Sequence, residues 1–283
     1  MSFASVFAMD TSFFNSLGSY GFDARCEMLA ELGYDATYLT LWDEAAWTDV
    51  RQLGAVRARH GLGVAAVFAE LFIDAPDDDP GNGRILDLLR TVEGTGTVEL
   101  TLRWRDPAGQ SGSPAGEGLA RRWLERLLPV AAERGITLAL YPHIRWWLER
   151  TEAAVRLCRA IDHPSLRITF PAFHWYVVDG TDLAGRLAET APYLALVNVC
   201  GSRRYDNGSG NPATIEPLDD GELDVFALLG AARAVGFDGP VGIQGYSVGG
   251  DAYAKLRRSL AAFRDIERRM DAHPDWASLR PPG

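Results

Sequence analysis

The sequence contains the stretch Gly236-Phe237-Asp238-Gly239-Pro240-Val241-Gly242-Ile243-Gln244-Gly245-Tyr246, in which a turn leads into a short apolar segment. The first five residues are rich in Gly and Pro, which is typical of a helix stop followed by a tight turn. Val241 to Ile243 then predict a buried strand, and Gln244 and Tyr246 place polar groups directly after it. A short entry turn and a polar exit are what one strand of a parallel α/β barrel requires.

The same unit recurs along the 283 residues of the chain. Short β-rich apolar runs predict strands at 4–9, 36–41, 63–72, 97–103, 137–141, 167–170, 194–199 and 241–244. Amphipathic runs predict helices near 21–32, 44–60, 83–91, 117–134, 151–161, 182–190, 223–235 and 251–270. Alternation without a second composition regime predicts an α/β chain with a single (β/α)8 TIM barrel over residues 1–270, followed by a Pro-rich tail at 271–283.

Loop lengths indicate which face of this barrel carries the site. The turns that lead into strands are short and contain helix stops, whereas long polar loops leave the strands at 74–83, 104–116, 141–150 and 201–218. A barrel builds its active site from the loops that follow the strands. We therefore expect the functional residues at the carboxyl ends of the strands.

Charge and composition exclude several classes of partner. The net charge of −10 argues against nucleic acid, since phosphate binding needs basic faces. The N-terminal segment has neither a basic region nor a long apolar stretch, so we expect no signal peptide and no membrane anchor. The three cysteines, Cys26, Cys158 and Cys200, are odd in number and widely spaced, which favours reduced thiols and a cytoplasmic protein. A homo-oligomer remains compatible with the sequence.

Two of the five histidines fall on the expected working face. His143 follows the fifth predicted strand and His174 the sixth, so we predict them as catalytic general acid and base. Glu70 lies inside an otherwise apolar run near the end of the third strand, where burial is costly unless the carboxylate is paired or functional. It is either a third proton-transfer group or one partner of a structural ion pair with a barrel arginine.

Other side chains near the predicted strand ends suit the binding of a small, polyhydroxylated molecule. Aromatic faces combined with amide, phenol and charged groups are typical of such pockets. Some of the tryptophans would instead only cap the barrel, and the arginines either bind an anionic group or are solvated. The predicted substrate-binding residues are Asp10, Trp42, Arg103, Tyr141, Arg145, Trp175, Asn198, Gln244 and Tyr246.

Several segments between residues 135 and 266 resemble the xylose isomerase-like barrel superfamily, in its sugar phosphate isomerase/epimerase group. They are Leu138-Ala139-Leu140-Tyr141-Pro142-His143, Ile161-Asp162-His163-Pro164, Ile168-Thr169-Phe170, Ile215-Glu216-Pro217-Leu218, Gly239 to Tyr246 and Arg257-Arg258-Ser259-Leu260. The resemblance implies the barrel fold, a sugar-like substrate and proton transfer next to a carbonyl.

The sequence departs from that family where its metal-dependent members hold a divalent cation. The resemblance places a Glu, an Asp, a His and a second Glu at the ends of strands five to eight, and this chain has Tyr141, Pro171, Asn198 and Gln244 there. Proline has no ligand atom in its side chain, and amides are poor ligands for transition metals. We therefore expect no family-type metal and no other cofactor.

These observations lead to one hypothesis and three alternatives. The leading hypothesis is an isomerase- or epimerase-like enzyme that acts on a small sugar by acid/base proton transfer without the family's metal. The alternatives are a sugar-binding barrel without turnover, a lyase or dehydratase that begins with the same proton abstraction, and a metal enzyme with a rebuilt ligand set. That last set would consist of His143, His174, Glu70 and Asp10.

Overall fold

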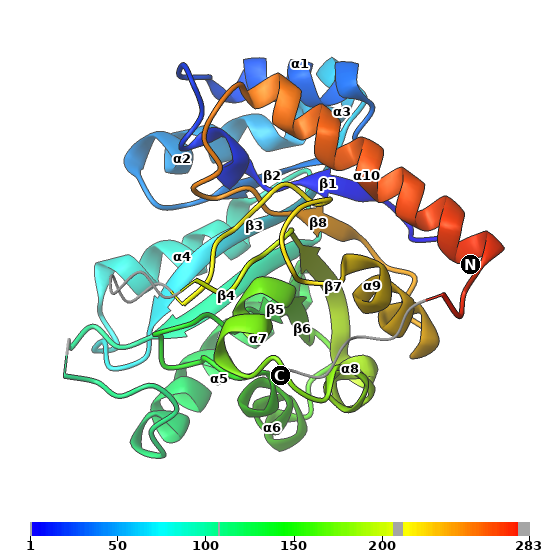
Figure 1. Ribbon diagram of the computed structural model, residues 1–283. Coiled ribbons are helices and arrows are strands. Elements are labelled where there is room, and N and C mark those ends of the chain that lie inside the picture. The colour runs from blue at the N-terminus through cyan, green and yellow to red at the C-terminus, as the bar shows by residue number, and fades with distance from the viewer. Residues whose placement is uncertain (1, 107, 206–211, 277–283) are drawn as a thin grey trace.

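A computed structural model describes residues 2–106, 108–205 and 212–276 as a closed barrel of eight parallel strands in chain order (Figure 1). The barrel closes where β1 pairs with β8, with Phe7 in register with Gly242. The predicted single (β/α)8 barrel is thus confirmed. The strands are β1 (Val6–Ala8), β2 (Ala36–Thr40), β3 (Gly63–Phe72), β4 (Thr97–Arg103), β5 (Thr137–Leu140), β6 (Leu166–Pro171), β7 (Leu194–Val199) and β8 (Val241–Ile243).

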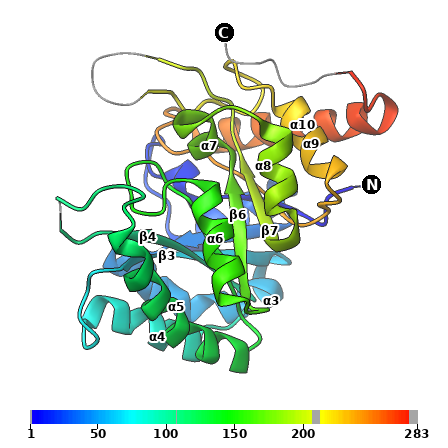
Figure 2. The same cartoon turned by 90° about the horizontal axis from the view of Figure 1, so that it is seen from below.

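Helices surround the barrel and cover its outer face, as the view along a second direction shows for α6 and α8 beside β6 (Figure 2). The α-helices are α1 (Phe22–Leu32), α2 (Glu44–Asp49), α3 (Val56–His60), α4 (Pro80–Thr91), α5 (Ala115–Glu133), α6 (Thr151–Ile161), α7 (Ala172–Val178), α8 (Leu183–Thr190), α9 (Val225–Ala234) and α10 (Ala252–Ala272). Three 3₁₀ helices complete the fold: η1 (Asp10–Phe13), η2 (Val50–Ala55) and η3 (Ala191–Tyr193).

Two differences from the predicted helices stand out. The helix expected at 44–60 is divided into α2, η2 and α3, because the chain winds more tightly between Val50 and Ala55 and buries Leu53 completely. Helix α7 was not predicted, because it has only seven residues and follows β6 directly. It matters for the site because it carries His174.

The strands separate two apolar cores. Alternate residues face outward into the large core beneath the helices or inward into a smaller cluster that includes Phe7, Tyr38, Phe68 and Tyr141. The interior is tightly filled near Gly242, where an added Cβ would lie 2.2 Å from Asn198 Oδ1. The lower barrel is therefore a packed core, and open space is left for the strand ends.

The C-terminal part of the chain runs along the outside of the barrel. Helix α10 continues to Ala272, and residues 277–283 of the expected tail lie outside the described residues. Within the described ranges, none of the helices is long and apolar enough to cross a membrane. Cys26, Cys158 and Cys200 are all free and buried.

Candidate functional site

A cavity of about 730 Å³ opens at the carboxyl ends of the strands, on the face that the loop lengths predict. Its volume is in the range of pockets that bind small molecules. It is lined by Met9, Thr11, Thr40, Trp42, Phe68, Tyr141, His143, Ile144, Arg145, Trp146, Phe173, His174, Tyr205, Ala213, Thr214, Ile215, Glu216, Gln244, Tyr246, Ser247, Val248 and Gly249.

The structure brings most of the predicted site residues to this cavity. The predicted residues among those that line it are Trp42, Tyr141, His143, Arg145, His174, Gln244 and Tyr246. The predicted residues that are not among them are Asp10, Glu70, Arg103, Trp175 and Asn198. The two histidines predicted as catalytic thus reach the cavity, whereas the third predicted catalytic group, Glu70, does not.

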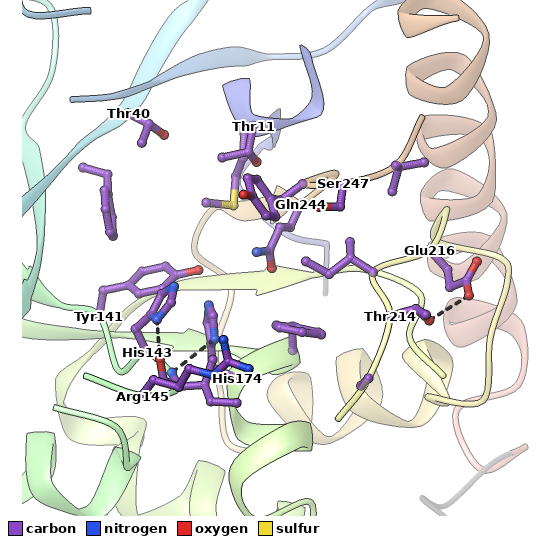
Figure 3. A pocket seen from close by; sticks show the side chains of 18 of the residues that line it. Thr11, Thr40, Tyr141, His143, Arg145, His174, Thr214, Glu216, Gln244 and Ser247 are labelled. Carbon is purple, nitrogen blue, oxygen red and sulfur yellow. Dashed lines mark hydrogen bonds between the residues drawn. The ribbon is translucent and has the colours of Figure 1, made fainter. Parts of the chain in front are cut away.

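His143 and His174 form a close pair on one side of the cavity (Figure 3). Their ring centroids are 4.0 Å apart, and His143 stacks on Trp146 at 3.7 Å with an angle of 13° between the planes. The rings of Tyr141 and His174 meet edge to face, with their centroids 5.5 Å apart. Aromatic contacts therefore hold both imidazoles in fixed orientations.

Burial keeps both imidazoles neutral at pH 7. It lowers the pKa of His143 from 6.5 to about 4, and the nearby Arg103 and Arg145 guanidiniums act in the same direction. Burial also lowers the pKa of His174 well below its usual range, and the neighbouring His143 adds to this effect. A neutral imidazole offers one bare nitrogen and one N–H, so the pair can both accept and donate hydrogen bonds.

Glu70 and Arg103 form an ion pair behind the histidines. Arg103 Nη1 lies 2.6 Å from Glu70 Oε2, and the guanidinium lies 4.9 Å from the centroid of the Trp146 ring. This is the structural alternative that the sequence allowed for Glu70. Arg103 in turn supports the tryptophan on which His143 stacks.

Asp10 also acts behind the cavity wall. Its carboxylate accepts hydrogen bonds from Thr40 N at 2.8 Å and Thr40 Oγ1 at 2.6 Å, and Arg25 lies 3.9 Å away. Burial raises the pKa of Asp10 to about 6, although these partners oppose the shift. Asp10 therefore holds Thr40, which lines the cavity.

Trp175 is buried in the outer core and is not among the residues that line the cavity. It is 4% exposed and packs against Phe170 in the outer core, with ring centroids 5.9 Å apart. By contrast, Trp42 and Tyr246 are partly exposed and meet edge to face at the cavity, 5.7 Å apart. These two rings provide an apolar wall against which a sugar ring can pack.

A buried carboxylate below the cavity escaped the sequence prediction. Glu99 of β4 is fully buried and accepts hydrogen bonds from the Tyr38 hydroxyl, from Thr169 Oγ1 at 2.6 Å and from Asn198 Nδ2 at 3.5 Å. Burial raises its pKa to about 7, although these three donors oppose the shift. Glu99 interrupts an apolar run just as Glu70 does, so the same sequence signal marks it.

Two amide oxygens in the described part of the structure are buried without a hydrogen-bond partner, Asn198 Oδ1 and Gln244 Oε1. Asn198 turns its Nδ2 toward Glu99, whereas Gln244 lines the cavity and is 8% exposed. Figure 3 shows the Gln244 side chain extending toward the side of the cavity that holds Tyr141 and the histidines. A buried amide oxygen without a donor is costly, so Gln244 is suited to accept a hydrogen bond from a ligand hydroxyl.

Glu216 lines the cavity as well, although it was not predicted as a site residue and belongs in the sequence to the family-like segment Ile215-Glu216-Pro217-Leu218. It lies across the cavity from the histidine pair, and its Oε1 accepts a hydrogen bond from Thr214 Oγ1 at 2.7 Å (Figure 3). Its place after the seventh strand in a long polar loop was the available signal. Among the described residues that line the cavity, Glu216 is the one carboxylate.

The residues at the family's metal-binding positions do not fit a divalent cation. Tyr141, Asn198 and Gln244 offer a phenol and two amides at the ends of β5, β7 and β8, and Pro171 ends β6. The rebuilt ligand set is dispersed as well, since Glu70 pairs with Arg103 and Asp10 with Thr40. Across the described residues, no group of three or more His, Cys, Asp or Glu side chains is placed to hold a metal ion.

Fold and cavity together define a (β/α)8 barrel with a polar and aromatic cavity at the strand ends, of a size suited to a small molecule. Residues 26–266 match the family described as xylose isomerase-like TIM barrel, and the chain belongs to this family. The match confirms the resemblance found in the sequence and extends it into the N-terminal half.

Known proteins similar to this chain include sugar-modifying enzymes. Mannonate dehydratase 1 of Bacillus licheniformis is 25% identical over 127 residues, which are 42% of this chain and only 34% of that protein. The structure of an L-ribulose 3-epimerase superposes with a TM-score of 0.74 at 17% identity, covering 99% of this chain and 100% of the other. A 3-keto-D-glucoside 4-epimerase from E. coli gives 0.72 at 20% identity, covering 92% and 99%. At these identities the two structures show a shared fold.

Proposed function

We propose that this protein is an isomerase- or epimerase-like enzyme that moves a proton next to the carbonyl of a small sugar without a divalent metal. The observation that carries the proposal is the pair of neutral, buried histidines 4.0 Å apart in the cavity, His143 and His174. A neutral imidazole can take a proton from carbon, and a hydrogen-bond donor beside it can stabilise the enolate oxygen that forms.

The remaining lining supports a polyhydroxylated substrate. Gln244 and Glu216 offer acceptors for hydroxyl groups on two sides of the cavity, while Trp42 and Tyr246 offer apolar ring faces. Tyr141, Arg145 and Thr40 add further polar atoms to the walls. Such a lining can orient a sugar by its hydroxyls while the histidines face its carbonyl.

A dehydratase is a second candidate, favoured by the similarity to mannonate dehydratase 1. It would begin with the same abstraction of a proton next to a carbonyl or carboxylate and then expel a neighbouring hydroxyl. Glu216, across the cavity from the histidines, would be placed to protonate that leaving group.

Deuterium exchange from D₂O tests the proposal. The protein is treated with a chelator, then incubated with a panel of aldoses, ketoses, keto-glycosides and sugar acids, and proton NMR follows each C–H signal. We expect exchange or isomerisation of at least one sugar by the chelated protein. New vinylic or deoxy signals would identify the dehydratase instead.

Three other outcomes would contradict the proposal. Turnover that requires a restored metal would show a rebuilt metal site. Saturation-transfer signals from a bound sugar without any exchange would show a sugar-binding barrel without turnover. The absence of both exchange and saturation transfer across the whole panel would rule out a sugar as the substrate.

A further inference from the structure

The two cavity histidines use one peptide group, that of Ile144, in opposite senses. His143 Nδ1 lies 2.8 Å from the Ile144 carbonyl oxygen, and the Ile144 N–H points at His174 Nδ1 at 3.4 Å (Figure 3). A carbonyl oxygen can only accept a hydrogen bond, and a backbone N–H can only donate one. The proton must therefore be on Nδ1 in His143, whereas Nδ1 of His174 must be bare.

These contacts fix the tautomer of each ring. Both imidazoles are buried and neutral, so each carries a single ring proton. His143 then has a bare Nε2, and His174 carries its proton on Nε2. Within the described residues, neither Nε2 has a hydrogen-bond partner, and both rings line the cavity.

We infer that the Ile144 peptide group assigns the two histidines different tasks: His143 Nε2 accepts the substrate's carbon-bound proton, and His174 Nε2–H donates a hydrogen bond to the substrate oxygen. This division of roles rests on the proposed function. Ile144 is a positioning residue that acts through its backbone, whereas His143 and His174 meet the substrate.

The chemistry of each step is consistent with this division. As His143 Nε2 takes the proton, the C–H electron pair forms a carbon–carbon double bond and the carbonyl π pair moves onto oxygen. The His174 N–H stabilises that oxyanion without giving up its proton, because losing it would leave an imidazolate. If the proton on His143 returns to the same carbon, the substrate is restored, and it is labelled when solvent deuterium has replaced that proton. If the proton is delivered to the former carbonyl carbon instead, the hydroxyl on the carbon that lost its proton becomes the new carbonyl, its own proton passes to the oxyanion, and the sugar is isomerised. A neutral imidazole in the same role as His174 is known from triosephosphate isomerase.

Nitrogen NMR tests the tautomers without any substrate. Long-range proton–nitrogen spectra of protein labelled at histidine, recorded at pH 8, distinguish a protonated ring nitrogen from a bare one. We expect the Nδ1–H form for His143 and the Nε2–H form for His174. His143 gives the stronger test, because an imidazole free in water favours the Nε2–H tautomer and the predicted Nδ1–H tautomer is the opposite one.

The chain supplies a matched internal control. His163 Nδ1 accepts a hydrogen bond from Ser165 N at 3.1 Å outside the cavity, so His163 should give the same pattern as His174. The variants His143→Gln, His174→Gln and His163→Gln assign the signals. An Nε2–H form for His143, or an Nδ1–H form for His174, would overturn the inference even if a sugar is turned over.

Kinetics test the division of roles with the sugar that exchanges. His143→Gln removes the base and should lower the exchange rate by about 10²–10⁴-fold. His174→Gln keeps an N–H donor, so it should retain much more activity than His174→Leu, which should lose about 10²–10³-fold. Equal losses in His174→Gln and His174→Leu would contradict the donor role. If the tautomers are as expected but no sugar in the panel exchanges, the proposed function fails while the tautomer assignment stands.

Discussion

The substitution Glu99→Gln should change how the stability of the barrel depends on pH. Glu99 is fully buried, and burial raises its pKa from 4.5 to about 7. Between these two values the unfolded chain releases the proton while the folded chain keeps it. The unfolding free energy of the wild type therefore falls as pH rises through this window, and glutamine removes this contribution.

The magnitude follows from the size of the shift. Each pKa unit corresponds to about 1.4 kcal/mol. With pKa values of 4.5 in the unfolded chain and about 7 in the folded chain, the contribution of Glu99 to the unfolding free energy falls by about 2.5 kcal/mol between pH 5 and pH 8. We expect the stability of Glu99→Gln relative to the wild type to rise by about this amount over that range. Asp10 and the histidines also titrate, but they are present in both proteins and cancel in the difference.

Urea denaturation followed by tryptophan fluorescence at pH 5, 6, 7 and 8 measures this difference. Glu133→Gln is the control, because Glu133 is exposed on the surface helix α5 and its variant should parallel the wild type. Parallel pH profiles for Glu99→Gln and the wild type would refute the reasoning. A relative stability that falls with pH would refute it as well, because the sign depends only on the raised pKa.

Three further predictions concern the cavity. The pKa of His143 is lowered to about 4, so this base stays neutral in moderate acid. The pH profile of kcat/KM should therefore show no loss through pH 6.5 and should fall only near pH 4. A loss of kcat/KM centred at pH 6.5 would contradict the assignment of His143 as the base. Glu70→Gln should leave turnover within about tenfold, since Glu70 pairs with Arg103 outside the cavity lining; a loss of about 10²–10⁴-fold would instead show general acid/base catalysis by Glu70. Gln244→Met keeps the size of the side chain but removes its amide oxygen as an acceptor. The dissociation constant of the sugar, measured by titration calorimetry, should therefore rise about tenfold while the fold is unchanged. An unchanged dissociation constant would show that Gln244 does not contact the ligand.

The sequence was sufficient for the barrel because its signals are local and repeated. Strand 63–72 and strand 97–103 were predicted with the bounds that β3 and β4 have, since a glycine-containing turn precedes each apolar run and a polar loop follows it. The same repetition placed His143 and His174 on the working face. Their closeness could not be predicted, because it depends on the short helix α7 that follows β6.

The sequence did not show how deep in the barrel each strand-end side chain lies. Asn198 and Gln244 end neighbouring strands, yet Gln244 lines the cavity while Asn198 lies below it, bonded to Glu99. Glu70 and Glu99 both interrupt apolar runs, and only strand pairing shows that one meets an arginine and the other meets three neutral donors. Such distinctions arise from contacts between strands distant in the sequence, which a residue pattern does not encode.

The most direct measurement is the exchange rate of a substrate C–H with D₂O by protein whose metal content has been shown to be negligible, while Mg²⁺, Mn²⁺ or Zn²⁺ is added in turn. We expect the metal-free protein to show the full rate already, and added metal should not raise it. His143→Gln should lower this rate by about 10²–10⁴-fold. A rate that is absent from the metal-free protein and appears in proportion to bound metal would contradict proton transfer by the histidine pair alone.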